Sequence, residues 1–155
     1  MLRGFLNARS AGVLASVAVL TMSLNAQQGG SSEPDKPVLT LQGDAALITV
    51  LIKPDKTADF ELVLAKLKEA LQKSEKPERK QQAASWRVYK SSQPLQGNAA
   101  YIMRIEPVIK GQEYDISRLI AEVFPVEVQE IFPKYRDAFA GRAIAELEPF
   151  MSMQP

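Results

Sequence analysis

The segment over residues 46–73 constrains the fold most strongly, because it joins a strand that is apolar on both faces to a long amphipathic helix. Side chains alternate between the two faces of a strand. One face here would carry Leu47, Thr49 and Leu51, and the other would carry Ile48, Val50 and Ile52. A strand with one wet face alternates apolar with polar residues, so this strand is expected to be covered on both sides.

A turn and a helix follow this strand. Pro54 stops the strand because proline has no N–H for the ladder, and Thr57 is expected to cap the helix. The apolar stripe of the helix consists of Phe60, Val63, Leu64, Leu67 and Leu71. This helix can cover one face of the strand, and something else must cover the other.

Two further strands are predicted in the middle of the chain, over residues 85–91 and 99–108. The loop over residues 93–98 contains strong turn formers and joins the two strands into an antiparallel hairpin. The charged stretch 74–82 before them is interpreted as a solvated connector, in which Pro77 can begin a short helical turn.

The C-terminal part predicts two helices and a last strand. Asp115 is expected to cap the first helix. The apolar stripe of that helix consists of Ile116, Leu119, Ile120 and Val123. Pro125 can begin the second helix, which is expected to kink or restart at Pro133 and to end at a Gly141 cap. A short strand over residues 142–148 follows. Its inward-facing side chains are expected to be Ala143, Ala145 and Leu147.

This order of elements is β-α-β-β-α-β, the ferredoxin-like α+β plan, and it is predicted for a domain over residues 38–150. Such a domain has a four-stranded antiparallel sheet with its helices on one face. The other face would be bare, although the first and third strands are apolar on both sides. A bare apolar sheet is unfavourable on a lone monomer, so a second copy packed sheet to sheet is the simplest remedy.

The N-terminal residues predict export. Residues 1–26 have a basic start and a short apolar core, which is typical of a secretory signal peptide; a retained N-terminal anchor is the alternative. A flexible polar linker is expected over residues 27–37. Residues 38–41 are interpreted as a short leading strand or an extended arm. The mature protein is therefore expected to be extracytoplasmic, in the periplasm or secreted, without stable membrane insertion.

Composition excludes several classes of chemistry. The chain contains no cysteine and no histidine, so disulfides, thiolate nucleophiles, Cys/His zinc sites and Ser-His-Asp triads cannot form within one chain. Removing residues 1–26 leaves 17 basic and 18 acidic residues, and this near-neutral charge gives no support for nucleic-acid binding. The sequence also lacks a Gly-rich phosphate loop and a carboxylate cluster with metal spacing.

Four stretches resemble the dimeric α/β-barrel superfamily, and within it the antibiotic-biosynthesis-monooxygenase-like group. They are ALITVLIKP, TADFELVLAKLKEAL, SWRVYKS and AAYIMRIEPV, and the resemblance extends from Ala46 to Phe150. It implies a small homodimer whose two sheets form a barrel with a cavity. Some members of the group oxygenate aromatic polyketides without a cofactor. Others degrade haem with the help of a histidine, which this chain lacks.

Four side chains are candidates for ligand binding: Trp86, Tyr89, Tyr101 and Arg104. Trp86, the single tryptophan, can stack against a ligand or fill the core or a dimer interface. Arg104 can clamp an anion or a carbonyl, or pair with Glu106 on the same strand face. Tyr89 and Tyr101 can donate hydrogen bonds to a ligand, act as weak acids or pack at an interface. No catalytic residue is assigned.

We therefore expect an exported homodimeric α/β-barrel protein that binds a small apolar or aromatic molecule without a cofactor or a metal. One alternative is a cofactor-independent monooxygenase or isomerase, in which Trp86, Tyr101 and Arg104 position an aromatic substrate. A second alternative is a structural partner of another envelope protein.

Overall fold

The computed structural model describes residues 36–153. The predicted signal peptide over residues 1–26 and most of the predicted linker over residues 27–37 lie outside the described residues. The elements in chain order are β1 (Ala45–Ile52), a 3-10 turn (Pro54–Lys56), α1 (Thr57–Lys73), α2 (Pro77–Ser85), β2 (Trp86–Lys90), β3 (Ala99–Ile105), α3 (Ile116–Val123), α4 (Val128–Ala138) and β4 (Phe139–Leu147). Within residues 36–153, no helix has the length and apolarity that a membrane span requires.

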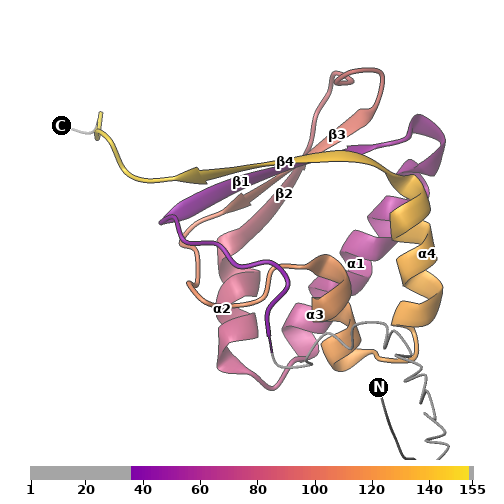
Figure 1. Ribbon diagram of the computed structural model, residues 1–155, viewed down its shortest axis with the longest axis horizontal. Coiled ribbons are helices and arrows are strands. Elements are labelled where there is room, and N and C mark those ends of the chain that lie inside the picture. The colour runs from indigo at the N-terminus through magenta and orange to yellow at the C-terminus, as the bar shows by residue number, and fades with distance from the viewer. Residues whose placement is uncertain (1–35, 154–155) are drawn as a thin grey trace, which may run out of the picture. The chain divides into compact units, whose positions relative to one another are not determined.

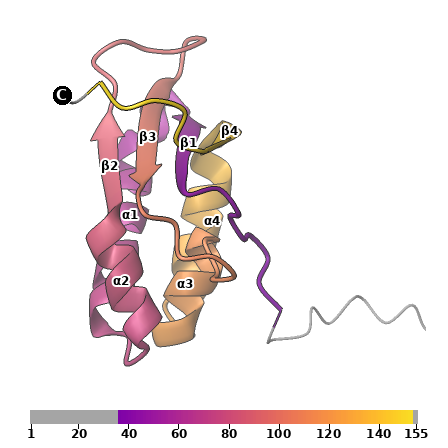
Figure 2. The same cartoon turned by 90° about the vertical axis from the view of Figure 1, so that its left-hand side faces the viewer.

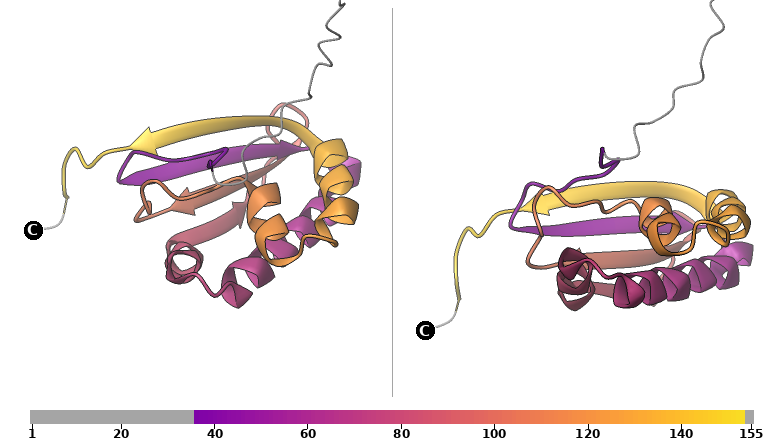
Figure 3. Two further views of the ribbon diagram at one scale, coloured as in Figure 1. Left: turned by 60° about the horizontal axis from the view of Figure 1, so that its bottom comes forward. Right: turned by 90° about the horizontal axis from the view of Figure 1, so that it is seen from below.

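The four strands form one antiparallel sheet in the order β2-β3-β1-β4, so β2 and β4 are the two edge strands (Figure 2). The four helices lie on one side of this sheet (Figures 1 and 3). This arrangement is the ferredoxin-like α+β plan, and the predicted fold class is confirmed.

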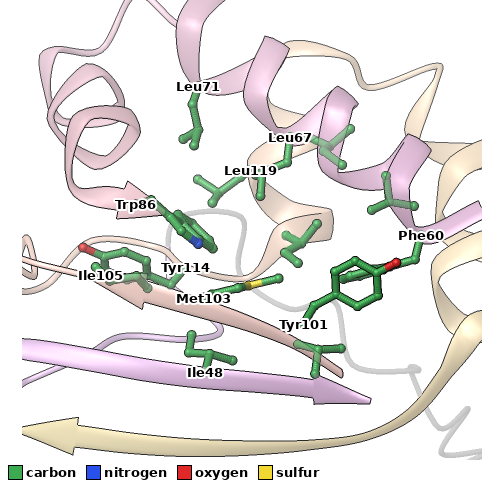
Figure 4. Packing of buried hydrophobic residues seen from close by; sticks show 14 of the residues in the cluster. Ile48, Phe60, Leu67, Leu71, Trp86, Tyr101, Met103, Ile105, Tyr114 and Leu119 are labelled. Carbon is green, nitrogen blue, oxygen red and sulfur yellow. The ribbon is translucent and has the colours of Figure 1, made fainter. Parts of the chain in front are cut away.

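The core fills the layer between the sheet and the helices (Figure 4). Along β1 every second side chain is buried and the intervening ones are half-buried, as expected when helices cover one face. The helical stripe of α1 packs against this face, and the ring of Phe60 meets that of Tyr101 edge-on with centroids 4.9 Å apart. The apolar periodicity of α1 therefore predicted its buried face correctly, whereas for β1 the sequence predicted two covered faces and the structure covers one.

Helix α2 corrects the prediction of a solvated connector over residues 74–82. Pro77 begins the helix, as its position allowed, but the helix continues to Ser85. Its inward face consists of Arg79, Gln82 and Ser85, which are spaced three residues apart and are all buried. Polar side chains can occupy such a face because they are hydrogen-bonded to one another and to neighbouring groups.

Strand β4 begins directly after α4, earlier than the strand predicted over residues 142–148. Gly141 therefore lies inside the strand, and the prediction that it caps a helix is wrong. The helix instead ends where Phe139 adopts an extended backbone conformation and starts to pair with Ile52.

The side chains of Ala143, Ala145 and Leu147 do not face the core, contrary to the prediction. The pairing places Ala143 beside Thr49 and Ala145 beside Leu47. Neighbouring residues across a sheet share a face, so these β4 side chains lie on the face opposite the helices. All three are exposed, and so is Ile144 on the other face of this edge strand.

The predicted helix ends are partly confirmed. The carboxylate of Asp115 accepts a hydrogen bond from the backbone N–H of Arg118 at 3.0 Å and caps α3 as predicted. Thr57, however, is the first residue of α1 instead of its cap, and Lys56 at the cap position makes no side-chain cap bond. The 3-10 turn that leads directly into α1 leaves no separate capping residue.

Helix α4 begins at Val128, not at Pro125, and Pro133 lies inside it without ending it. A proline removes one hydrogen bond from a helix interior, and packing of the helix can offset that loss. Ile131 and Ala138 of this helix are buried in the core.

Residues 38–41 form no strand, and the chain bends at Val38 and Leu39; we call these four residues the arm. The arm is held by Glu113, whose carboxylate accepts the backbone N–H groups of Val38 and Leu39 at 2.6 and 3.0 Å. Tyr114 donates its backbone N–H to the carbonyl of Leu39 at 2.8 Å. These bonds seat Leu41, which is 0% exposed, in the core.

Candidate functional site

The sheet face opposite the helices is an apolar surface that no helix covers (Figures 1 and 3). We call it the open face. Its residues are Arg87 and Tyr89 of β2, Ala100, Ile102 and Arg104 of β3, Leu47, Thr49 and Leu51 of β1, and Gly141, Ala143, Ala145 and Leu147 of β4. Both faces of β1 are apolar, as predicted, and the helices cover only one of them. The apolar side chains on its other face are therefore partly exposed to solvent.

Polarity changes across the open face from one edge to the other. The β1 and β4 side carries aliphatic side chains, alanines and one threonine. At the β2 edge, Arg87 lies directly opposite Arg104, and Tyr89 lies opposite Ile102. Two like charges in facing positions repel each other unless an acid lies close by.

Glu106 supplies that acid. Its carboxylate forms an ion pair with the guanidinium of Arg104, and both side chains remain about half exposed. The pKa of Arg104 is raised, first by Glu106 and also by the hydroxyl of Tyr89. Arg87 makes no ion pair among residues 36–153, so this corner holds two guanidinium groups, of which only that of Arg104 is paired with a carboxylate. The corner can attract an anionic or carbonyl group.

A hollow of about 410 Å³ lies on the open face beside this corner. Its charged lining consists of Arg104 and the three carboxylates of Asp44, Glu106 and Glu148, and its apolar lining includes Leu47, Leu147 and Pro149. The hollow thus combines apolar walls with a few charged groups, a combination found in sites for small molecules.

The four predicted site residues are divided between the two faces of the sheet. Tyr89 and Arg104 lie on the open face, whereas Trp86 and Tyr101 point toward the helices and are 7% and 2% exposed (Figure 4). In one chain, a ligand that contacts Arg104 therefore cannot reach Trp86 or Tyr101 on the far side of the sheet.

Trp86 packs in the core against Tyr114, with ring centroids 5.6 Å apart. Its indole N–H has no hydrogen-bond partner among the described residues. The void that Trp86 lines with Met103 and Ile48, between sheet and helices, is only about 10 Å³. Such a void holds about one water molecule, so it offers no room for a substrate.

The hydroxyl of Tyr101 is engaged in a closed polar cluster. It donates to the carboxylate of Glu61 at 2.7 Å, and Lys90 donates to the same oxygen at 2.7 Å. Burial and the hydrogen bond to Glu61 raise the pKa of Tyr101, so its proton stays in place near neutral pH. Lys90 and Tyr101 in turn lower the pKa of Glu61. This arrangement stabilises structure and does not resemble an acid poised for proton transfer.

Sequence reasoning missed a groove of about 500 Å³ between α1 and the edge strand β2. Its apolar wall includes Leu64, Leu67, Leu71, Trp86 and Val88. The sequence did contain one sign of this groove. The apolar stripe of the long helix α1 includes Leu64 and Leu71, and the short strand β2 cannot cover the whole stripe.

The described residues offer no obvious place for a metal ion. Within residues 36–153, no three Asp or Glu side chains cluster as metal ligands would, and the whole chain lacks histidine and cysteine. The chain matches no protein-family model, no characterised protein and no solved structure.

Proposed function

We propose that this protein is an exported homodimer of the dimeric α/β-barrel type, in which two open faces pack together. Between the sheets it would bind a small apolar or aromatic molecule beside Arg104, without a cofactor. The observation that carries this proposal is the open face, where apolar side chains lie half-buried or exposed with no element over them.

The hollow beside Arg104 supports the choice of ligand. Leu47 and Leu147 provide apolar contact, while the guanidinium can bind a carbonyl or an anionic group on the same molecule. When a second sheet covers this hollow, water is excluded and such polar contacts become stronger.

The positions of the aromatic residues argue against the alternative of a cofactor-independent monooxygenase. That hypothesis needs Trp86, Tyr101 and Arg104 to position one substrate, but the first two are buried on the other face of the sheet. The alternative of a structural envelope partner requires only the open face, and the experiments below separate it from ligand binding.

The substitution Ala143→Arg tests the dimer. Ala143 is exposed on the open face, so an arginine there leaves the isolated fold intact but buries a charge in a sheet-to-sheet interface. Val126→Arg is the matched control, because Val126 is 80% exposed between α3 and α4. Light scattering coupled to size exclusion should give dimers for the parent and the control, and monomers for Ala143→Arg. A monomeric parent chain, or an unaffected Ala143→Arg dimer, contradicts the proposal.

An anionic aromatic dye, 8-anilinonaphthalene-1-sulfonate, tests the ligand site through its fluorescence. We expect the dimer to bind the dye, Arg104→Gln to bind it less tightly, and Glu106→Gln to bind it more tightly, because these changes remove and add net positive charge beside the hollow. A dimer that binds no dye overturns the ligand part of the proposal and favours the structural role.

A further inference from the structure

The residues that follow β4 form a short apolar segment, which we call the tail (residues 148–153). Phe150, Met151 and Met153 are 94%, 65% and 88% exposed. The tail extends past the end of the sheet, away from the helices (Figures 1 and 3). Consecutive large apolar side chains exposed to this degree mark a segment that docks elsewhere.

The groove between α1 and β2 has the complementary chemistry. Its wall is apolar, and Lys68 and Arg87 line it without an ion pair among residues 36–153. Glu148 of the tail also makes no ion pair within this range. The edge strand β2 further leaves alternate backbone groups unpaired, which an extended segment can satisfy.

We infer that the tail of one copy seats in the groove of a second copy, with Phe150 against the apolar wall and Glu148 near Lys68 and Arg87. This inference rests on the proposed homodimer and adds a second contact between its two copies.

In a two-fold dimer, the tail of one copy can contact the groove of the other copy. Within one chain the tail leaves from β4 and crosses the strand ends toward the β2 side, but none of its residues lines the groove (Figures 2 and 3). When two sheets face each other about a two-fold axis parallel to the strands, β4 of one copy lies beside β2 of the other. A tail that turns outward from β4, away from its own β2, then reaches the partner's groove, and both edges of both sheets are covered.

The small size of the open face supports the need for this contact between tail and groove. Four strands about 4.8 Å apart and about seven residues long give a face of roughly 450 Å², whereas a stable interface buries about 800 Å² on each partner. One phenylalanine can bury about 150–250 Å², so two reciprocal tails bring the contact to the usual size.

Disulfide trapping tests the inference in the full chain, which has no cysteine of its own. Val88 lines the groove and Phe150 lies in the tail, so chains carrying Val88→Cys are mixed with chains carrying Phe150→Cys and oxidised. We expect a linked dimer on a denaturing gel from this mixture, and none when Val126→Cys replaces Val88→Cys. If Val88→Cys and Phe150→Cys placed in one chain link only within that chain, the inference is overturned.

A second measurement distinguishes a dimer without the tail contact from a protein that does not dimerise. Replacing Phe150, Met151 and Met153 together by serine should raise the dimer dissociation constant by roughly 100-fold, with Val126→Ser as the control. An unchanged constant overturns the tail contact and leaves the sheet-to-sheet dimer standing. If the parent chain does not dimerise, both the proposed dimer and the tail contact are overturned.

Discussion

At the level of single residues, Arg79 shows how a charged stretch can hold the core together. Its Nε and one terminal nitrogen donate to the two carboxylate oxygens of Glu122 at 3.2 and 2.9 Å. The other terminal nitrogen donates to Gln82 and Gln112 at 2.8 and 3.1 Å. The arginine side chain is 7% exposed, so this network ties α2 to α3 away from solvent. A bidentate pair of this kind is stronger than an exposed salt bridge.

Removing that guanidinium should therefore be costly. We expect Arg79→Met to lower the free energy of unfolding by about 2–4 kcal/mol, because it leaves two amide oxygens without this donor and the carboxylate of Glu122 with only Ser74 and Lys76 as donors. The exposed neighbour Lys80 is the control, and Lys80→Met should change stability by less than about 0.5 kcal/mol. Urea unfolding followed by circular dichroism measures both; equal effects would show that the network contributes little.

At the level of elements, apolar periodicity determined what could be predicted. It identified β1, α1 and the β2–β3 hairpin, since their buried residues are apolar at the spacing of each element. It missed α2, because the buried face of that helix is polar and hydrophobic patterns do not detect it. It also assigned β4 to the wrong face, because alternating alanines do not indicate which side the helices cover.

The same limit applies to the candidate site. The alternation of side chains along a strand is enough to place Trp86 and Tyr89 on opposite faces of the sheet, and Tyr101 and Arg104 likewise, and the structure has them so. The sequence could not show that Trp86 and Tyr101 are packed against helices, because that depends on which face α1 and α3 occupy. Nor could it show the groove, which arises where a long helix meets a short strand.

The junction of β1 and β4 depends on Gly43, where space is more limiting than backbone conformation. A Cβ at Gly43 would lie 3.0 Å from the backbone oxygens of Ala45 and Leu147. We expect Gly43→Ala to destabilise the protein by about 1–3 kcal/mol. Gly141→Ala is the control, since its Cβ would meet only Leu51 at an ordinary 3.7 Å. Thermal unfolding compares the two variants, and similar melting temperatures would argue against crowding at this junction.

At the level of the whole molecule, ion pairs should make the fold sensitive to acid. Lys66 and Lys73 lower the pKa of Glu69 to about 2. Burial acts to raise the pKa of Glu122, but hydrogen bonds from Arg79 and Lys76 outweigh it and bring the pKa below 4.5. A carboxyl whose pKa is lowered by folding stabilises the folded state above its unfolded pKa, and this contribution is lost as the pH falls through the folded value.

We therefore expect the free energy of unfolding to fall as the pH drops from about 6 to about 3. Glu122→Gln should be less stable than the parent at the upper end of this range, and the difference should shrink at the lower end, because protonation then removes the same charge from the parent. Urea midpoints across the range measure the two curves. Parallel curves would show that Glu122 is not one of the titrating groups.

The carboxylate of Glu113 also has a mechanical consequence. It accepts the backbone N–H groups of Val38 and Leu39 on the arm and those of Tyr114 and Asp115 on its own segment. A pull on the chain from the N-terminal side would load these bonds in parallel before it reached β1. Tension on the upstream chain would therefore fall first on the carboxylate of Glu113 and on the backbone bond between Tyr114 and Leu39, and it would reach the sheet only after these bonds had broken.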